Sequence, residues 1–196
     1  MNKSALIIVD VQNDFCPGGS LAVPNGDLVI KPINKMISYA KKNHWLTLAS
    51  RDRHPKITSH FKLYGGVWPV HCVRNTAGAK FHPKLKFQDL VLINKGTVKN
   101  EDGYSVFDGK TEDNQSLLDF LKKNNVDRLY IGGLATDYCV KQTVLDTKKF
   151  GFKIIVIIDA CRAVNLKPDD EKKSIEVMKK AGARIVTSKQ ILNENN

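Results

Sequence analysis

No run of about 18 consecutive apolar residues occurs in the 196-residue sequence, so no segment resembles a membrane-spanning helix. The N-terminus has only a short apolar run, residues 5–9, and no small-residue cleavage site, unlike a secretory signal. The four cysteines, at positions 16, 72, 139 and 161, lack C-x-x-C spacing, which argues against a disulfide framework or a thiolate zinc cluster. We therefore expect a cytoplasmic protein with no membrane partner.

Acidic residues are fewer than basic ones, 20 against 31, and the net charge of +11 raises the question of nucleic-acid binding. The lysines are spread along the chain in pairs such as Lys122-Lys123 and Lys179-Lys180, which fall within or at the ends of predicted helices. No basic run is interleaved with stacking aromatic residues, and no nucleic-acid-binding motif is present. We expect a solvated basic surface and no nucleic-acid partner.

Short apolar runs alternate with helical patterns along most of the chain. Several runs are continuously apolar, as in strands buried on both faces, and they predict strands at residues 5–9, 46–49, 90–93, 128–131, 153–158 and 184–186. Apolar stripes between them predict helices over residues 30–40, 117–121, 140–148 and 169–182. Asp113 and Asn114 are capping-type residues before the second helix. The alternation predicts a Rossmann-like, three-layer α/β/α fold with a mostly parallel sheet, in one domain over residues 1–196.

Three residues with catalytic chemistry follow predicted strands, and ligands of open parallel sheets bind beyond the carboxyl ends of the strands. Asp10 ends the first strand, Lys95 follows the third and Cys139 follows the fourth. Each has a plainer interpretation, as a turn residue, a surface lysine or a buried apolar side chain. Cys139, however, falls in the first turn of a helix that opens after the capping residue Thr136, where amide groups and a nearby ammonium favour the thiolate. We interpret the three as a nucleophilic triad.

Histidines gather in the irregular stretch over residues 53–89, whose apolar residues follow neither a helical nor a strand periodicity. A loop of this length within a compact domain usually has a function. Asp52 and His54 are one residue apart, so both can face one metal ion, and His60 and His71 can fold back toward it. This set of oxygen and nitrogen donors suits zinc, iron or manganese. A surface position is an equally good interpretation for His60, and Cys72 is a weaker candidate ligand.

Five blocks of the sequence together resemble the nicotinamidases, also called pyrazinamidases, of the isochorismatase-like cysteine hydrolases. The blocks are ALIIVDVQNDFCPGGSLAV (5–23), SRDRHP (50–55), WPVHC (68–72), NKG (94–96) and GGLATDYCV (132–140). They occur in the family's order and cover most of the chain. The resemblance implies an isochorismatase-like hydrolase fold and hydrolysis of the small molecule nicotinamide to nicotinate and ammonia. It also implies activity on pyrazinamide and a role in NAD salvage. It is compatible with a homo-oligomer as well as with a monomer.

The resemblance implies roles for individual residues as well. The family's catalytic triad matches Asp10, Lys95 and Cys139. The family binds one divalent metal ion, zinc in the first place with iron or manganese as alternatives. Its ligand positions match Asp52, His54 and His71, and in some members also His60. The walls of its substrate site match Phe15, Trp68, Leu134 and Tyr104. Its oxyanion hole matches the amides of Ala135 and Cys139, with a cis peptide joining Leu134 to Ala135.

The implied mechanism passes through a thioester, which Cys139 forms after giving its proton to Asp10. Two alternatives are another cysteine amidohydrolase of this fold that acts on a different small amide, and a non-catalytic basic binding module. The metal-type histidines argue against the carbamoyl-amide hydrolases of the family, which lack them. The acid, the amine and the thiol at one edge of the predicted sheet argue against a binding module.

Overall fold

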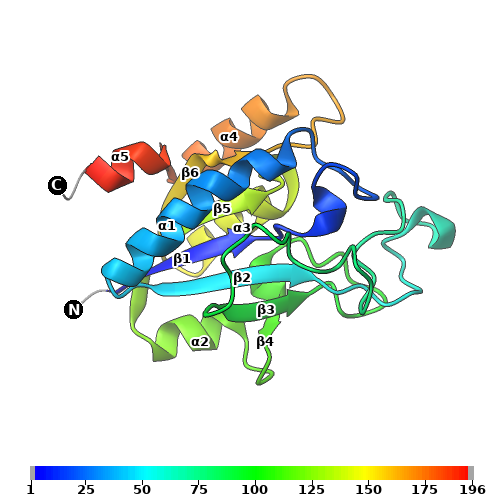
Figure 1. Cartoon of the computed structure of the whole chain (residues 1–196), viewed down its shortest axis with the longest axis horizontal. Helices are drawn as coiled ribbons and strands as arrows, with labels where there is room; N and C mark the ends of the chain where they lie inside the picture. The colour runs from blue at the N-terminus through cyan, green and yellow to red at the C-terminus, as the bar shows by residue number, and fades with distance from the viewer. Residues whose placement is uncertain (1–2, 194–196) are drawn as a thin grey trace.

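A seven-stranded sheet forms the centre of the computed structural model, which describes residues 3–193 (Figure 1). In spatial order the strands are β4, β3, β2, β1, β5, β6 and β7. Along the chain they are β1 (Lys3–Val9), β2 (Leu46–Asp52), β3 (Val91–Lys95), β4 (Lys110–Thr111), β5 (Val126–Leu134), β6 (Lys153–Arg162) and β7 (Arg184–Val186). Among these strands only the pair β3 and β4 is antiparallel. The prediction of a mostly parallel sheet is confirmed.

Helices cover both faces of the sheet. They are α1 (Ile30–Lys42), α2 (Leu117–Lys123), α3 (Lys141–Lys149), α4 (Asp170–Lys180) and α5 (Ser188–Asn193). In β1, Leu6 and Ile8 pack in one apolar cluster with α1 and α5, while Ile7 and Val9 pack in another with α2, α3 and α4. Successive strand side chains point to opposite faces, so the continuously apolar run of β1 is buried on both sides. Figure 1 shows α1 in front of the sheet and α3 behind it.

Some local expectations are wrong. The side chain of Ser116, not Asp113 or Asn114, caps α2 by accepting a hydrogen bond from the Asp119 amide. Thr136 is not a side-chain cap either, because its hydroxyl donates to Glu171 at 3.2 Å and a turn of π-helix (Thr136–Val140) opens directly at it. The two-residue strand β4 and the helix α5 have too few residues to give a periodic signal.

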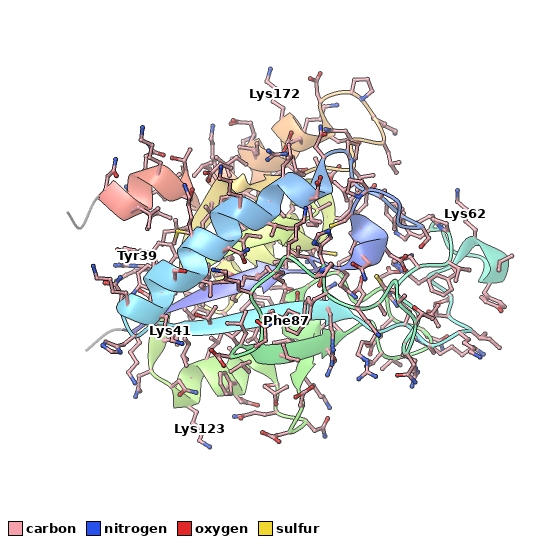
Figure 2. The ribbon with its side chains drawn as sticks, in the orientation of Figure 1. Tyr39, Lys41, Lys62, Phe87, Lys123 and Lys172 are labelled. Carbon is pink, nitrogen blue, oxygen red and sulfur yellow. The ribbon has the colours of Figure 1, made fainter. Side chains whose placement is uncertain are left out.

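Basic side chains are dispersed over the surface. Figure 2 shows the labelled Lys41, Lys62, Lys123 and Lys172 at different sides of the molecule, and all four are exposed. Within the described residues, no helix has both the length and the apolar character needed to span a bilayer.

An irregular segment leaves the carboxyl end of β2 and occupies one end of the sheet, as Figure 1 shows. Isolated bridges pair His54 with Val73 and Phe61 with Trp68, and a short 3-10 helix (Lys62–Tyr64) lies between the members of the second bridge. The segment therefore folds back on itself beside the end of the sheet at which β1, β3 and β5 also finish.

Candidate active site and metal site

The three predicted catalytic residues come together at the carboxyl edge of the sheet. Asp10 follows β1, Lys95 ends β3 and Cys139 lies in the π-helical turn after β5. The Lys95 ammonium nitrogen lies 2.8 Å from Asp10 Oδ2 and 3.5 Å from Cys139 Sγ. The exposed fractions of Asp10, Lys95 and Cys139 are 0%, 1% and 8%. An acid, an amine and a thiol from three separate strands thus share one water-poor site.

Lys95 is held as a cation. Besides the contact with Asp10, its Nζ donates to Asp52 Oδ1 at 2.6 Å and to the Gly103 carbonyl at 2.8 Å. Burial alone would lower the pKa of Lys95, but the two carboxylates raise it well above its usual value. The ammonium therefore stays charged and joins Asp10 to Asp52.

The thiol of Cys139 is neutral at rest. Burial raises its pKa well above the ordinary value, and the nearby Asp10 and Asp52 carboxylates add to this against the attraction of Lys95. The helix amides and the ammonium favour the thiolate, but desolvation and two anions outweigh them, so the thiol keeps its proton until Asp10 takes it. Burial raises the pKa of Asp10 to about 6, although Lys95 opposes the shift. At neutral pH Asp10 is ionised and can take the thiol proton.

The turn that carries Cys139 has the backbone features that the sequence resemblance implies. The peptide joining Leu134 to Ala135 is cis. Gly133, just before it, has φ +133, and a Cβ there would lie 2.1 Å from the Val9 carbonyl oxygen of the neighbouring strand. Only glycine fits this close approach of β5 to β1.

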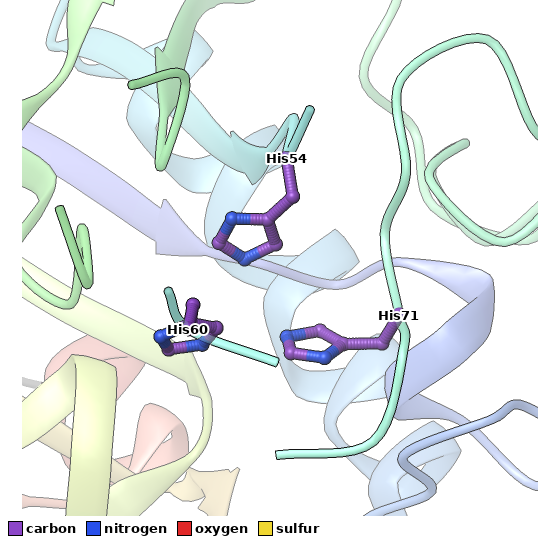
Figure 3. A group of neighbouring side chains, drawn as sticks. All are labelled: His54, His60 and His71. Atoms are coloured by element: carbon purple, nitrogen blue, oxygen red, sulfur yellow. The ribbon is translucent and has the colours of Figure 1, made fainter. Parts of the chain in front are cut away.

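Three histidine rings form a compact group beside the triad, as Figure 3 shows for His54, His60 and His71. The ring centroids of His54 and His60 are 4.7 Å apart, and His71 lies 5.0 and 5.4 Å from them. One ring nitrogen from each lies within 4.8 Å of the others, and all three side chains are buried. The structure therefore places His60 inside the cluster. Cys72 lies in the apolar cluster under α1.

Each ring is oriented through its Nδ1 atom. The acceptors are the Gly96 carbonyl for His54 at 3.0 Å, the Pro69 carbonyl for His71 at 2.8 Å and the Asp102 carboxylate for His60 at 2.9 Å. Acceptor-only partners assign the ring hydrogen to Nδ1 and leave the lone pair on Nε2. Burial lowers the pKa of His71 to about 4, so this ring is neutral at pH 7.

The donor set fits a divalent metal ion. His54 Nε2 is fully buried and has no hydrogen-bond partner among residues 3–193, a state that costs free energy unless something binds there. Three imidazoles with anchored Nδ1 atoms are the usual arrangement of metal-binding histidines. Asp52 Oδ2 lies 3.6 Å from His54 Nε2 and adds a carboxylate at the edge of the group.

Asp52 connects the triad with the histidines. One of its oxygens accepts from Lys95 while the other faces His54. Burial alone would raise the pKa of Asp52, but Lys95 and the histidines hold it well below its usual range. Gln12 fixes the Asp52 backbone, accepting from its amide at 2.8 Å and donating to its carbonyl at 2.9 Å. The two halves of the site therefore share one ionised carboxylate.

A small, mainly apolar cavity opens onto Cys139 and the histidine cluster. The four predicted wall residues all line it, namely Phe15, Trp68, Leu134 and Tyr104. Trp68 Nε1 donates to the Tyr104 hydroxyl at 2.8 Å, which fixes two of the aromatic walls relative to one another. A space walled by aromatic rings, with a thiol on one side and imidazoles on another, suits a flat ring that carries one reactive group.

Comparison with known proteins decides the family. The sequence model of the isochorismatase domain matches residues 4–190. The nicotinamidase of Escherichia coli (strain K12) is 40% identical over 95% of this chain and 96% of its own length. This chain is a member of the isochorismatase-domain family.

Solved structures agree with this membership. The pyrazinamidase of Pyrococcus horikoshii in complex with zinc has 44% identity and a TM-score of 0.86, covering 94% of this chain and 99% of that one. PnC1 from L. infantum in complex with nicotinate has 32% identity and a TM-score of 0.84, covering 96% of this chain and 94% of that one. The isochorismatase-like α/β fold predicted from the sequence is therefore confirmed.

In this member of the isochorismatase-domain family, the sequence prediction missed two neighbours of the nucleophile. Tyr138 lines the cavity, with its ring edge-to-face against Trp68 at 4.8 Å. Asp137 is buried, and its carboxylate accepts from the amides of Val164 at 3.0 Å and Asn165 at 2.8 Å. Asp137 thereby ties the turn of Cys139 to the cavity wall at Val164. An aspartate in a predicted strand-to-helix turn was the available signal, but its partners lie 27 and 28 residues away.

Proposed function

We propose that this protein is an amidohydrolase that converts nicotinamide to nicotinate and ammonia and also deamidates pyrazinamide. The observation that carries the proposal is that Cys139 of the triad lines the same small aromatic cavity as His60 and His71 of the histidine group. The identity shared with an enzyme named nicotinamidase and with a pyrazinamidase of known structure supports this substrate class.

In the first half-reaction, Asp10 takes the proton of Cys139, and Sγ attacks the carboxamide carbon. Lys95 stays protonated and stabilises the charge that passes between the thiol and the carboxylate. The amides of Ala135 and Cys139 are the proposed donors to the oxyanion, each worth roughly 3–4 kcal/mol of transition-state stabilisation. Asp10 then gives its proton to the departing amine, so that ammonia leaves and a nicotinoyl thioester remains on Cys139.

In the second half-reaction, water attacks the thioester carbon and Asp10 takes the proton of that water. The bond from carbon to Sγ breaks, and Asp10 returns the proton to the sulfur. Nicotinic acid leaves and ionises in solution. Every proton accepted by Asp10 is thus given back within the cycle, and the thiol is restored.

His54, His60 and His71, with Asp52 beside them, are the proposed ligands of one divalent metal ion. When bound, this ion supplies a Lewis-acid position for the pyridine nitrogen and for water. Three imidazoles and one carboxylate suit zinc, with iron and manganese as alternatives, and the zinc complex of the Pyrococcus horikoshii relative supports that choice. The aromatic walls of Phe15 and Trp68 would hold the pyridine ring between this group and Cys139.

We further propose that residues 1–196 form one domain, that the enzyme is cytoplasmic, and that it takes part in nicotinamide salvage for NAD synthesis. The match of the family over residues 4–190 supports the single domain. The dispersed lysines support the absence of a nucleic-acid or membrane partner. A homo-oligomer stays a prediction.

The test is release of ammonia from nicotinamide, pyrazinamide and benzamide, with metal analysis of the same sample. We expect turnover of the first two amides and little of benzamide, which lacks the ring nitrogen. If the protein turned over only other small amides, it would be an amidohydrolase with a different substrate. No turnover of any amide by metal-loaded protein would contradict the proposal.

A further inference from the structure

The three histidines of the cluster differ in what anchors them. His54 and His71 bond through Nδ1 to backbone carbonyls, at Gly96 and Pro69. His60 instead bonds to a charged side chain, Asp102 Oδ1, at 2.9 Å. Asp102 is 64% exposed, whereas the His60 side chain is only 3% exposed. A solvent-facing carboxylate therefore holds a buried ring.

The carboxylate does two things that a neutral acceptor does less well. As an acceptor it requires the hydrogen of His60 to lie on Nδ1, so that Nε2 carries its lone pair toward His54 and His71. As an anion it makes the imidazole a stronger electron donor. His60 lies on an irregular segment and not on a strand. The direction of its ring therefore depends on side-chain hydrogen bonds more than that of a strand residue does.

The loop that carries Asp102 holds the His60 turn at a second point. The Lys99 carbonyl accepts hydrogen bonds from the Ser59 amide at 3.0 Å and from the Thr58 hydroxyl at 2.9 Å. The same loop provides the Gly103 carbonyl that binds Lys95. The backbone contacts place the turn beside the loop, while the Asp102 contact fixes the ring itself.

We propose that Asp102 is the positioning residue of the metal site, the group that fixes His60 as a third imidazole ligand and thereby sets metal affinity. The inference rests on the metal site in the proposed function. Asp102 also lines the cavity, and the effect that we assign to it acts on the metal through His60. Because Asp102 is mostly exposed, its replacement should leave the core of the protein intact.

Three variants test this. Asp102→Ala removes the acceptor, and Asp102→Asn keeps an acceptor oxygen but loses the charge. Glu101→Ala is the matched control, because it removes the exposed carboxylate of the preceding residue, outside the histidine cluster. The measurements are the zinc dissociation constant of metal-stripped protein, by competition with a chelator, and the visible spectrum of the cobalt-loaded protein. Thermal unfolding of the metal-free variants checks the fold.

We expect Asp102→Ala to weaken zinc binding about 10- to 100-fold, Asp102→Asn to weaken it less, and Glu101→Ala to leave it unchanged. The cobalt spectrum of Asp102→Ala should approach that of a fourth variant, His60→Ala, which lacks the ligand itself. Wild-type affinity and spectrum in Asp102→Ala would overturn this inference while leaving the proposed function standing. An equal loss in Glu101→Ala would also overturn it, since the effect would then be one of net charge. A wild-type protein that binds no metal would overturn both proposals.

Discussion

The two halves of the active site are held in different ways. The triad residues sit at or just beyond the ends of β1, β3 and β5, and the sheet itself sets their separation. The three histidines lie beyond the end of β2, on an irregular segment, and are oriented by hydrogen bonds to two carbonyls and one carboxylate. We call the triad the sheet-held half and the histidine cluster the loop-held half. Substitutions in the sheet-held half should change stability and activity by leaving buried charges without partners. Substitutions in the loop-held half should change metal binding by altering the orientation of the ligands.

The link between the halves is Lys95, whose ammonium binds Asp10 and Asp52. Lys95→Met should cost about 3–5 kcal/mol of unfolding free energy, because it leaves two buried carboxylates facing one another. It should also abolish amidase activity, since Asp10 would then hold its proton at neutral pH. Urea unfolding and ammonia release measure the two effects. Wild-type stability in this variant would mean that the sheet-held half does not depend on its central cation.

Removing the metal should affect the loop-held half more than the sheet-held half. We expect nicotinamide to bind about tenfold more weakly or worse after the ion is stripped, because the ring nitrogen loses its Lewis-acid partner. Calorimetric titration of stripped and reloaded protein gives the comparison, with metal content verified in each sample. The unfolding of the sheet should change less than binding does. Equal affinity with and without metal would contradict the assignment of the histidine cluster to the substrate ring.

Asp137 tests how far the sheet-held half extends. Asp137→Ala should cost about 3 kcal/mol of unfolding free energy, because two backbone amides, those of Val164 and Asn165, lose a buried charged acceptor. It should also raise KM, since Val164 lines the cavity. Asp127→Ala is a control, because its ion pair with Lys153 lies at the surface and is worth less than about 1 kcal/mol. If both variants lost the same unfolding free energy, Asp137 would not stabilise the cavity wall more than a surface ion pair does.

The pH dependence reports on Asp10. Its raised pKa of about 6 means that the carboxyl is ionised, and able to take the thiol proton, above that pH. The value of kcat/KM should therefore fall about tenfold per unit as the pH drops below about 6. Ser50 donates to Asp10 Oδ1 at 2.7 Å and favours the ionised form, so Ser50→Ala should move this limb upward by about one unit. A profile that stays flat to pH 5 would exclude Asp10 as the base.

The same contrast explains what the sequence could predict. Asp10, Lys95 and Cys139 could be assigned because parallel strands finish at one edge, so residues that follow strands must lie near one another. His60 could not be separated from a surface histidine, because its position depends on the folding of an irregular segment. Asp102 lies 42 residues from His60, and Gln12 lies 40 from Asp52, distances at which no local pattern signals a hydrogen bond.

The protonation of the nucleophile was the other limit. The helix amides and the ammonium near Cys139 were visible in the sequence pattern, and both favour the thiolate over the thiol. Its burial, together with the Asp10 and Asp52 carboxylates around it, has the opposite effect and prevails. Desolvation is set by the packing of the whole cavity, which the identity of neighbouring residues does not reveal.

The most direct measurement of the central claim is ammonia release from nicotinamide by Cys139→Ala, compared with wild-type protein of the same metal content and unfolding temperature. We predict a loss of turnover on the order of 10⁵-fold or more, with the fold and the bound metal unchanged. Turnover near the wild-type rate in that folded, metal-loaded variant would contradict the account.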